Sequence, residues 1–140
     1  MNVTCEHLER YMKTFEELKL NEIMGTKASE DEMKVMKSWE MYIYGVDNMG
    51  HPIVYDRLGS LDLTTLEDVY SRNPLIIKVA KYRFMTKLGN LKSYLSNKYN
   101  KLIYKHVMIF DMSGFTKRFM GSTPRKLCKE IIHDLAEMYP

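Results

Sequence analysis

The side chains that could do chemistry in this sequence are a few carboxylates at the ends of expected strands and a long series of cations. Asp111 follows the apolar run Val107–Phe110, where an α/β enzyme could place an acid. An Asp there also fixes a turn by accepting from the backbone of Met112–Gly114, and we favour this structural role. The chain has no nucleophile elbow, zinc-protease motif, P-loop or dinucleotide-binding glycine pattern. The sequence therefore predicts no enzyme and no catalytic residue.

Metal ligands do not gather in the sequence either. The four histidines are scattered, at positions 7, 51, 106 and 133. A zinc site needs three or four ligands at characteristic spacings, and no such spacing occurs. We therefore expect no metal and no cofactor.

The cations are concentrated in one part of the chain. The net charge is only +3, but from Val69 to Phe110 the sequence contains no Asp or Glu. A run of cations is usually a solvated helix face, yet the absence of carboxylates over such a stretch predicts a positive potential on one side. Anionic lipid headgroups attract such a surface with about 1 kcal/mol per Lys or Arg. We expect the membrane-facing cations to be Lys78, Lys81, Arg83, Lys87 and Lys92.

Nucleic-acid phosphate is the other natural partner for a basic stretch. The stretch between Lys78 and Lys105 is also rich in tyrosine, which could stack on bases. However, no RNA- or DNA-binding motif accompanies it. We therefore regard nucleic acid as the less favoured partner.

A β-hairpin is the clearest structural element that the sequence predicts. Asp47 and Asn48 can hydrogen-bond their own backbone in a turn, and Gly50 can adopt a positive φ. Pro52 fits at the start of a strand, where a missing N–H does least harm. We expect strands over Met41–Val46 and Pro52–Leu58.

Helix start signals divide the rest of the chain. Ser29 and Glu32 form a capping box, which predicts a helix over Glu30–Ser38. Asn73–Pro74 predicts the start of a long helix, with a kink or a break expected at Gly89–Asn90. Its apolar stripe consists of Ile77, Ala80, Phe84, Leu88, Leu91 and Leu95. Further helices are expected over Thr4–Leu20, over Thr64–Tyr70 and after Ser122, and a buried strand over Tyr104–Asp111.

Composition sets the class of protein. A chain of 140 residues is long enough for one domain with a real core. The N-terminus has no apolar signal region, and no apolar run approaches the roughly 18 residues that a membrane span needs. We expect a cytoplasmic protein whose contact with membranes is peripheral.

Four motifs follow one another in a characteristic order. They are a G-x-D-x-x-G-x-P hairpin ending in L-G (Gly45–Gly59), a helical region (Asp62–Asn100), an apolar strand leading into D-x-x-G (Val107–Phe115), and Y-P (Met138–Pro140). Together they resemble the CRAL-TRIO family of lipid-binding domains over roughly residues 38–140. The resemblance implies an α/β fold, a mixed β-sheet with flanking helices. It divides the chain into a short N-terminal helical segment, residues 1–38, and the N-terminal part of a CRAL-TRIO-like domain, residues 39–140.

The resemblance also implies a ligand site. Family members hold one apolar ligand between a sheet floor and surrounding helices, and each buried lipid CH₂ contributes about 0.8 kcal/mol. It therefore implies binding or intermembrane transfer of a phosphoinositide or another phospholipid. The long helix either walls the cavity or packs on the sheet's far face, and the sequence leaves both open. The expected ligand-binding residues are Ile53, Tyr55, Phe84, Leu88, His106, Met108 and Phe110.

The residue types narrow the choice of lipid. Members that bind phosphatidylcholine carry tyrosine and hydroxyl side chains on the hairpin and on the following strand. Those positions correspond here to Ile43, Val54, His106 and Met108, none of which has a hydroxyl. Phosphatidylcholine is therefore not supported as the ligand.

The resemblance places the family's last strands and gate helix beyond Pro140, so we expect an incomplete, C-terminally truncated domain. The next strand would pair beside Tyr104–Asp111, and without it this apolar strand keeps an open edge. We expect self-association or a partner at that edge. The alternative function is a protein-interaction module that retains the fold, carries no lipid, and binds a small GTPase or another partner.

Overall fold

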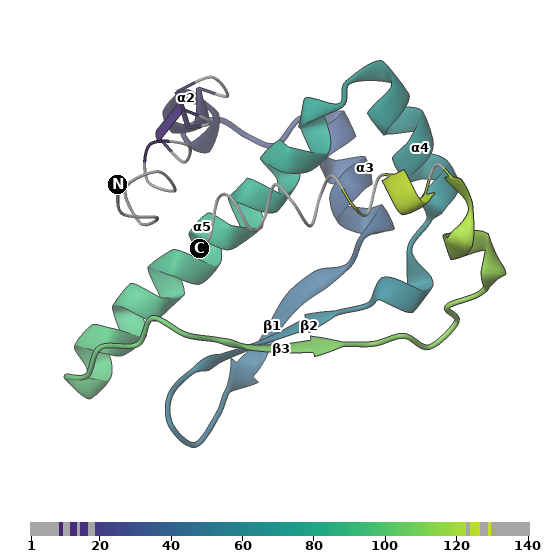
Figure 1. Cartoon of the computed structure of the whole chain (residues 1–140). Helices are drawn as coiled ribbons and strands as arrows, with labels where there is room; N and C mark the ends of the chain where they lie inside the picture. Colours follow the sequence, from purple (N-terminus) through teal and green to yellow (C-terminus); the bar gives the residue numbers. More distant parts are fainter. Residues whose placement is uncertain are drawn as a thin grey trace.

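The computed structural model describes residues 19–122 without a break and, outside that range, residues 9, 12, 13, 15, 16, 124–126 and 129. The helix expected over Thr4–Leu20, most of the helix expected after Ser122, and the motif Met138–Pro140 lie outside the described residues. The elements in chain order are α2 (Leu20–Met24), α3 (Glu30–Ser38), β1 (Met41–Val46), β2 (Pro52–Asp56), the short 3₁₀ helix η1 (Leu58–Ser60), α4 (Leu63–Arg72), α5 (Leu75–Tyr99), β3 (Val107–Phe110) and the 3₁₀ helix η2 (Lys117–Met120) (Figure 1).

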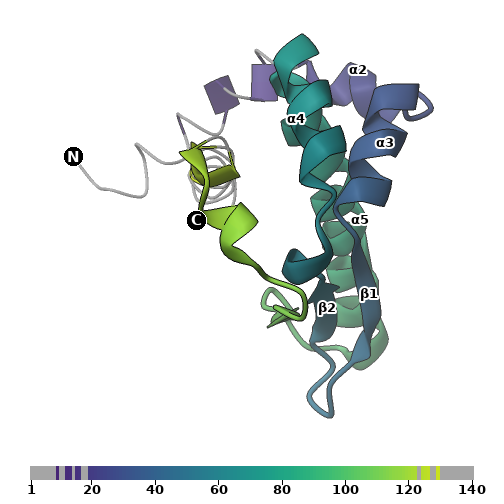
Figure 2. The ribbon, with the colours of Figure 1, turned by 90° about the vertical axis from the view of Figure 1, so that its right-hand side faces the viewer.

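The strands form a mixed sheet in the order β1-β2-β3. β1 pairs antiparallel with β2, and β2 pairs parallel with β3. The helices α3, α4 and α5 pack against one another, and α5 runs beside the sheet (Figures 1 and 2). The structure therefore confirms the α/β class, with a mixed sheet and flanking helices.

The hairpin turn forms as its residue types predict. The Asp47 carboxylate accepts from the N–H groups of Met49 and His51, each at 2.8 Å. Gly50 has a φ of +87°, a conformation that glycine adopts most easily. Pro52 is the first residue of β2, as expected.

The helices also begin and end close to the predicted residues. In the capping box of α3, Ser29 Oγ accepts from the N–H of Glu32 at 3.2 Å, and the Ser29 N–H donates to the Glu32 carboxylate at 2.6 Å. α4 extends the predicted helix slightly at both ends. α5 continues through Gly89–Asn90 to Tyr99, so the break considered there is wrong.

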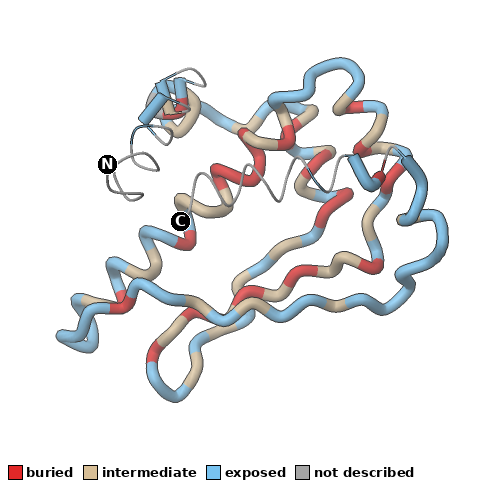
Figure 3. Tube along the Cα trace, in the orientation of Figure 1, coloured by how far each residue is buried: buried red, intermediate tan, exposed pale blue. Residues whose placement is uncertain are grey.

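The core lies where the three long helices meet. Figure 3 shows the buried residues gathered there and along β2, whereas the far end of α5 is mostly exposed. The main cluster of buried side chains consists of Val35, Trp39, Leu66, Val69, Ile77 and Ala80. The packing of α3, α4 and α5 against one another therefore forms the main core, and the sheet lies beside it.

β3 is shorter than the strand expected over Tyr104–Asp111, since only Val107–Phe110 pair with β2. Within the described part of the chain, no strand lies along the outer edge of β3. Val107 and Phe110 are 40% and 56% exposed. β3 is thus a largely exposed edge strand of the described sheet, so the expectation of a buried strand is wrong, whereas the open edge is as expected.

Two of the four motifs that carried the resemblance, L-G and D-x-x-G, are in direct contact. The Gly59 N–H donates to the carbonyl of Asp111 at 2.9 Å. A Cβ atom on Gly59 would overlap the carbonyl group of Ser113, and Gly114 has a φ of +87°. L-G and D-x-x-G therefore require glycine because two backbone segments pass within van der Waals contact.

Replacing Gly59 tests this contact. We expect Gly59→Ala to lower the free energy of unfolding by about 2 kcal/mol or more, because η1 and the segment after β3 must move apart. Gly89→Ala is the control, since nothing lies within 4 Å of its added methyl group. In the middle of α5 it should stabilise by about 0.5–1 kcal/mol. Urea denaturation measures both, and equal effects of the two substitutions would contradict the close approach.

Candidate functional site

The sheet has one face toward the helices and one face away from them. Along β2, Pro52, Val54 and Asp56 are buried, and Ile53 and Tyr55 between them are half-buried. Asp56 is connected to α3 and α5 through contacts described below. Because side chains alternate along a strand, Val54 shares its side with Asp56. We call this the helix-side face and the opposite one the open face.

β3 continues the helix-side face. Met108 pairs with Val54 and Phe110 with Asp56, and residues paired in a parallel ladder point to the same side. Val54 is fully buried, whereas Met108 is half-buried and Phe110 is 56% exposed. The helix-side face is therefore covered over β2 and only partly covered over β3.

α5 supplies the opposing wall. Lys81 reaches the sheet, and Phe84, Leu88 and Lys92 follow it at helical spacing on the same side. His106, just before β3, lies near Lys92: burial first and the Lys92 charge second lower the pKa of His106. Burial also lowers the pKa of Lys92. The residue before β3 and the helix α5 thus bring a half-buried imidazole and a half-buried amine together.

Five of the predicted ligand-binding residues consequently share one region. Phe84 and Leu88 lie on the same side of α5 as Lys81, His106 lies near Lys92, and Met108 and Phe110 lie on the helix-side face of the sheet, where Phe110 is largely exposed. α5 contacts β2 on this face of the sheet, and both roles considered for the long helix stay predictions.

Ile53 and Tyr55 do not belong to that region. They lie on the open face, where the Tyr55 ring stacks on Tyr42 with centroids 5.2 Å apart. The Tyr55 hydroxyl donates to Asp111 at 2.8 Å. The expectation that all seven residues line one cavity is therefore wrong for these two, because alternation along β2 sends them to the opposite side.

A small pocket opens beside the same wall. It lies between the end of α3, the start of β1 and α5, and Trp39, Met41, Lys81, Phe84 and Lys87 are among its lining residues. Its volume is about 140 Å³. Sites for drug-sized ligands occupy roughly 300–1,000 Å³, so this pocket alone cannot enclose a phospholipid.

A buried polar cluster includes three of the lining residues, Trp39, Met41 and Lys81. Trp39 Nε1 donates to Asp56 Oδ1 at 2.8 Å. The Lys81 ammonium lies 3.5 Å from the centroid of the Trp39 ring and donates to the sulfur of Met41 at 2.8 Å. Burial lowers the pKa of Lys81 and raises the pKa of Asp56, while each charge opposes the effect of burial on the other. The cluster joins β1, β2, the end of α3 and α5.

The predicted membrane-facing cations fall into two groups. Lys81 and Arg83 are only 6% and 7% exposed, so the expectation that they meet a membrane is wrong. Arg83 Nε donates to Glu32 at 2.5 Å, and its Nη1 donates to the carbonyl of Thr26 at 2.9 Å. Lys78, Lys87 and Lys92 are exposed or half-buried.

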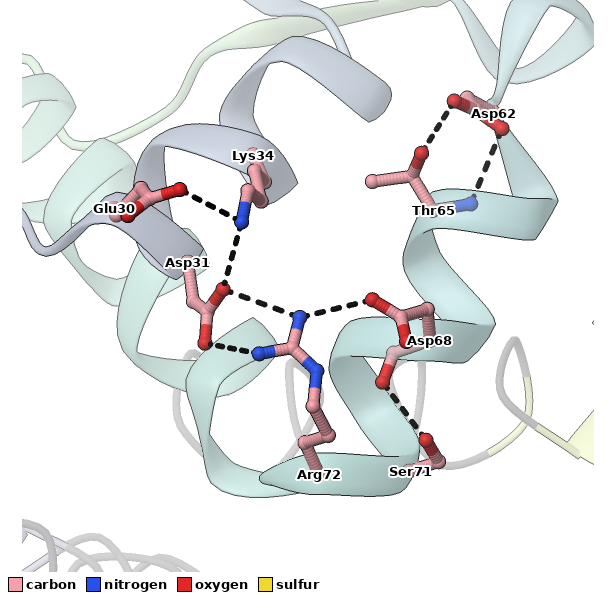
Figure 4. A network of polar contacts seen from close by, with 8 residues as sticks. All are labelled: Glu30, Asp31, Lys34, Asp62, Thr65, Asp68, Ser71 and Arg72. Carbon is pink, nitrogen blue, oxygen red and sulfur yellow. Dashed lines mark hydrogen bonds and ion pairs between the residues drawn. The ribbon is translucent and has the colours of Figure 1, made fainter.

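Carboxylates from other segments compensate the first part of the basic stretch. Arg72 donates to Asp31 and Asp68, which joins α4 to α3 (Figure 4). Lys34 pairs with Glu30 in the same network. The first part of the interval without Asp or Glu is therefore compensated by carboxylates that precede it in sequence and lie beside it in space.

Asp111 has the structural role that its position predicts. Its carboxylate accepts from the N–H of Ser113 at 2.8 Å and from the Tyr55 hydroxyl at 2.8 Å. These bonds, with Ser113 first, hold the pKa of Asp111 at about 2. An acid this strong stays ionised at neutral pH and makes a poor proton donor.

Sequence reasoning missed the cluster of Trp39, Asp56 and Lys81. The one available signal is that Lys81 interrupts the apolar stripe of α5, four residues after Ile77 and three before Phe84. A cation on a buried stripe requires a partner, but its identity depends on tertiary structure.

The architecture defines an α/β domain in which an antiparallel hairpin and a parallel strand carry an apolar face toward a long helix. The family model of the CRAL/TRIO domain matches residues 36–140, most of the chain. The chain therefore belongs to the CRAL/TRIO family, whose domains bind lipophilic ligands. A comparison with curated proteins finds no match. None of the helices in the described part of the chain is long and apolar enough to cross a bilayer.

The buried cluster predicts a pH-dependent stability. Asp56→Asn keeps an acceptor for Trp39 but leaves Lys81 buried without a countercharge, which should cost about 3 kcal/mol at neutral pH. The folded-state pKa of Lys81 lies below its usual 10.5, so the folded chain binds fewer protons than the unfolded chain as pH approaches that value. The stability of Asp56→Asn should therefore rise with pH up to about 10.5.

Urea denaturation at a series of pH values measures this rise. The control adds Lys81→Met, which removes the buried amine from the Asp56→Asn background. This double variant should regain most of the lost stability and show no such rise. A rise that persists without Lys81 would contradict the assignment.

Proposed function

We propose that this protein binds a phospholipid on the helix-side face of its sheet and carries it between membranes. The observation that carries the proposal is the partly uncovered apolar surface of Met108 and Phe110 beside α5, in a chain of the CRAL/TRIO family. Burying lipid chains there would add about 0.8 kcal/mol per CH₂. The pocket near Trp39 is lined by Lys81 and Phe84 of the same helix.

The charge beside this surface favours an anionic headgroup. Within the described residues, no carboxylate pairs with Lys92, which lies near His106. A phosphate at this place would act against the lowering of both pKa values, because a nearby anion favours the charged form of a cation. A phosphoinositide or another anionic phospholipid is therefore the proposed cargo, taken up by a cytoplasmic, peripheral protein that performs no catalysis.

Substitutions on neighbouring residues of β3 test the binding surface. Met108→Trp places a large ring on the helix-side face and should reduce the bound lipid about tenfold, since it displaces a few methylene groups. Ile109→Trp is the matched control, because it adds the same ring to the open face. Mass spectrometry of lipid extracted from the purified chain, with a vesicle-to-vesicle transfer assay, measures both.

The comparison of these two variants decides the outcome. Equal lipid content in the two would contradict binding on the helix-side face. A folded wild-type chain that carries no extractable lipid and transfers none would overturn the carrier function. Co-purification with a GTPase or another protein in that case would favour the interaction module.

The open edge of β3 favours a second property, self-association. Val107, Ile109 and Phe110 are exposed along this edge, and an unpaired apolar strand readily pairs with another chain. β1 is the other edge of the described sheet, but a bulge between Ile43 and Gly45 makes it a poorer template. We therefore propose that two copies associate through β3.

A pair of valines offers a matched test of association. Val107 in β3 and Val46 in β1 are almost equally exposed, 40% and 41%, at opposite edges. Val107→Lys should shift the chain toward monomer, because a lysine disfavours edge pairing, and Val46→Lys should not. Sedimentation equilibrium measures the masses. A wild-type monomer at all concentrations, or equal effects of both substitutions, would contradict association through β3.

A further inference from the structure

The last turn of α5 and the loop after it form a projecting part of the molecule, residues Lys98–Lys105, which we call the basic corner. In Figure 1 it lies at the end of α5 farthest from α4. Leu102 is 77% exposed and Tyr104 is 64% exposed. Lys98, Lys101 and Lys105 alternate with these side chains in the sequence. Cations, tyrosines and one aliphatic side chain are thus combined on a single exposed loop.

Local contacts hold this loop in a defined shape. Asn100 ends α5 with a φ of +47°, and the Lys101 N–H donates to the carbonyl of Ser96 at 3.1 Å. The Ile103 N–H donates to the Ser96 hydroxyl at 2.9 Å, and Ile103 is buried. Since Ile103 is the buried anchor, its neighbour Leu102 is left on the outside. The exposure of Leu102 is therefore a consequence of the fold.

The lysines of the basic corner keep their charge uncompensated. Within the described residues, no carboxylate pairs with Lys98, Lys101 or Lys105, and Lys98 and Lys105 lie 5.5 and 5.4 Å from the ring centroids of Tyr99 and Tyr104. The hairpin tip, which lies outside the stretch that lacks carboxylates, carries one carboxylate, that of Asp47. The tip approaches Tyr99 and Ile103 at Gly50, but the Asp47 carboxylate is occupied by its own turn and by His51.

Distance separates this charge from the carboxylates that neutralise the rest of α5. Fifteen residues divide Arg83, which pairs with Glu32, from Lys98. At 1.5 Å per helical residue this is about 22 Å, more than twice the Debye length at physiological salt. The carboxylates of α3 and α4 therefore do not cancel the field at the basic corner.

We infer that the basic corner is the surface through which this protein docks on an anionic phospholipid membrane, an inference that rests on the proposed lipid-carrier function. Lysine charge suits anionic headgroups, tyrosine suits the level of the headgroups, and Leu102 can enter the acyl boundary. Nucleic acid offers phosphate and stacking but no apolar medium for Leu102. The membrane is therefore the partner that uses all three kinds of side chain.

Sedimentation of the full chain with vesicles tests the inference. The vesicles contain phosphatidylcholine alone or phosphatidylcholine mixed with phosphatidylserine. Replacing Lys98, Lys101 and Lys105 together by glutamine should weaken binding to the mixed vesicles about 100-fold. Leu102→Ala should weaken it about fivefold, because part of a buried leucine is lost.

A charge-matched variant provides the control. Lys27, Lys37 and Lys117 are exposed and lie away from the basic corner, so their triple replacement by glutamine should leave vesicle binding within about threefold of wild type. A loss as large as that of the corner variant would overturn the inference, because it would show dependence on net charge alone. Equal binding to both kinds of vesicle would also overturn it.

Two further measurements separate this inference from the proposals it rests on. The corner variants should retain the extractable lipid of the wild type, because they leave the helix-side face unchanged. A chain without extractable lipid that still sediments in the predicted order would overturn the carrier function and support the docking surface. Salt-sensitive binding to oligonucleotides, with an affinity equal to that for vesicles and unchanged in Leu102→Ala, would overturn the inference. Nucleic acid would then be the partner.

Discussion

The structure depends on the burial of one carboxylate, that of Asp56. Its side chain accepts from Trp39 and lies in the field of Lys81, while its carbonyl accepts from the Asp111 N–H at 2.8 Å. One residue of β2 thereby connects the end of α3, the wall helix α5 and the strand β3. A buried charge is tolerated only when partners replace the lost hydration, so the positions of the helices relative to the sheet are linked to this site.

Features that depend on nearby residues could be predicted from the sequence. The hairpin turn at Asp47–Gly50 and the capping box at Ser29 are closed by residues within four positions of one another. The apolar stripe of α5 also predicted its buried side, because helical period alone determines which residues share a face. The motif at Gly59 is an intermediate case: its order relative to Gly114 indicated the family, but the backbone contact between them became visible only in three dimensions.

Features that depend on distant partners could not be predicted. Arg83 and Lys81 looked like surface cations because no carboxylate occurs near them in the sequence, yet Glu32 and Asp56 reach them from earlier segments. Side chains alternate along β2, which separates Val54 from Ile53 and Tyr55, but the sequence does not show which side is turned to α5. The predicted ligand site included Ile53 and Tyr55, and the sheet turns them toward the open face.

The same reasoning explains why α5 has two different ends. Its first half lies against α3 and α4, where every buried cation must be matched, and Glu32 and Asp56 are the residues that match them. Its second half extends past those helices and contacts mainly the hairpin tip and the loop before β3. Lys98 near its end is exposed and remains hydrated, so no carboxylate is required to hold it. α5 is longer than the part of it that packs against α3 and α4. The covered part has its cations neutralised by carboxylates, and the part that extends to the basic corner keeps its positive charge.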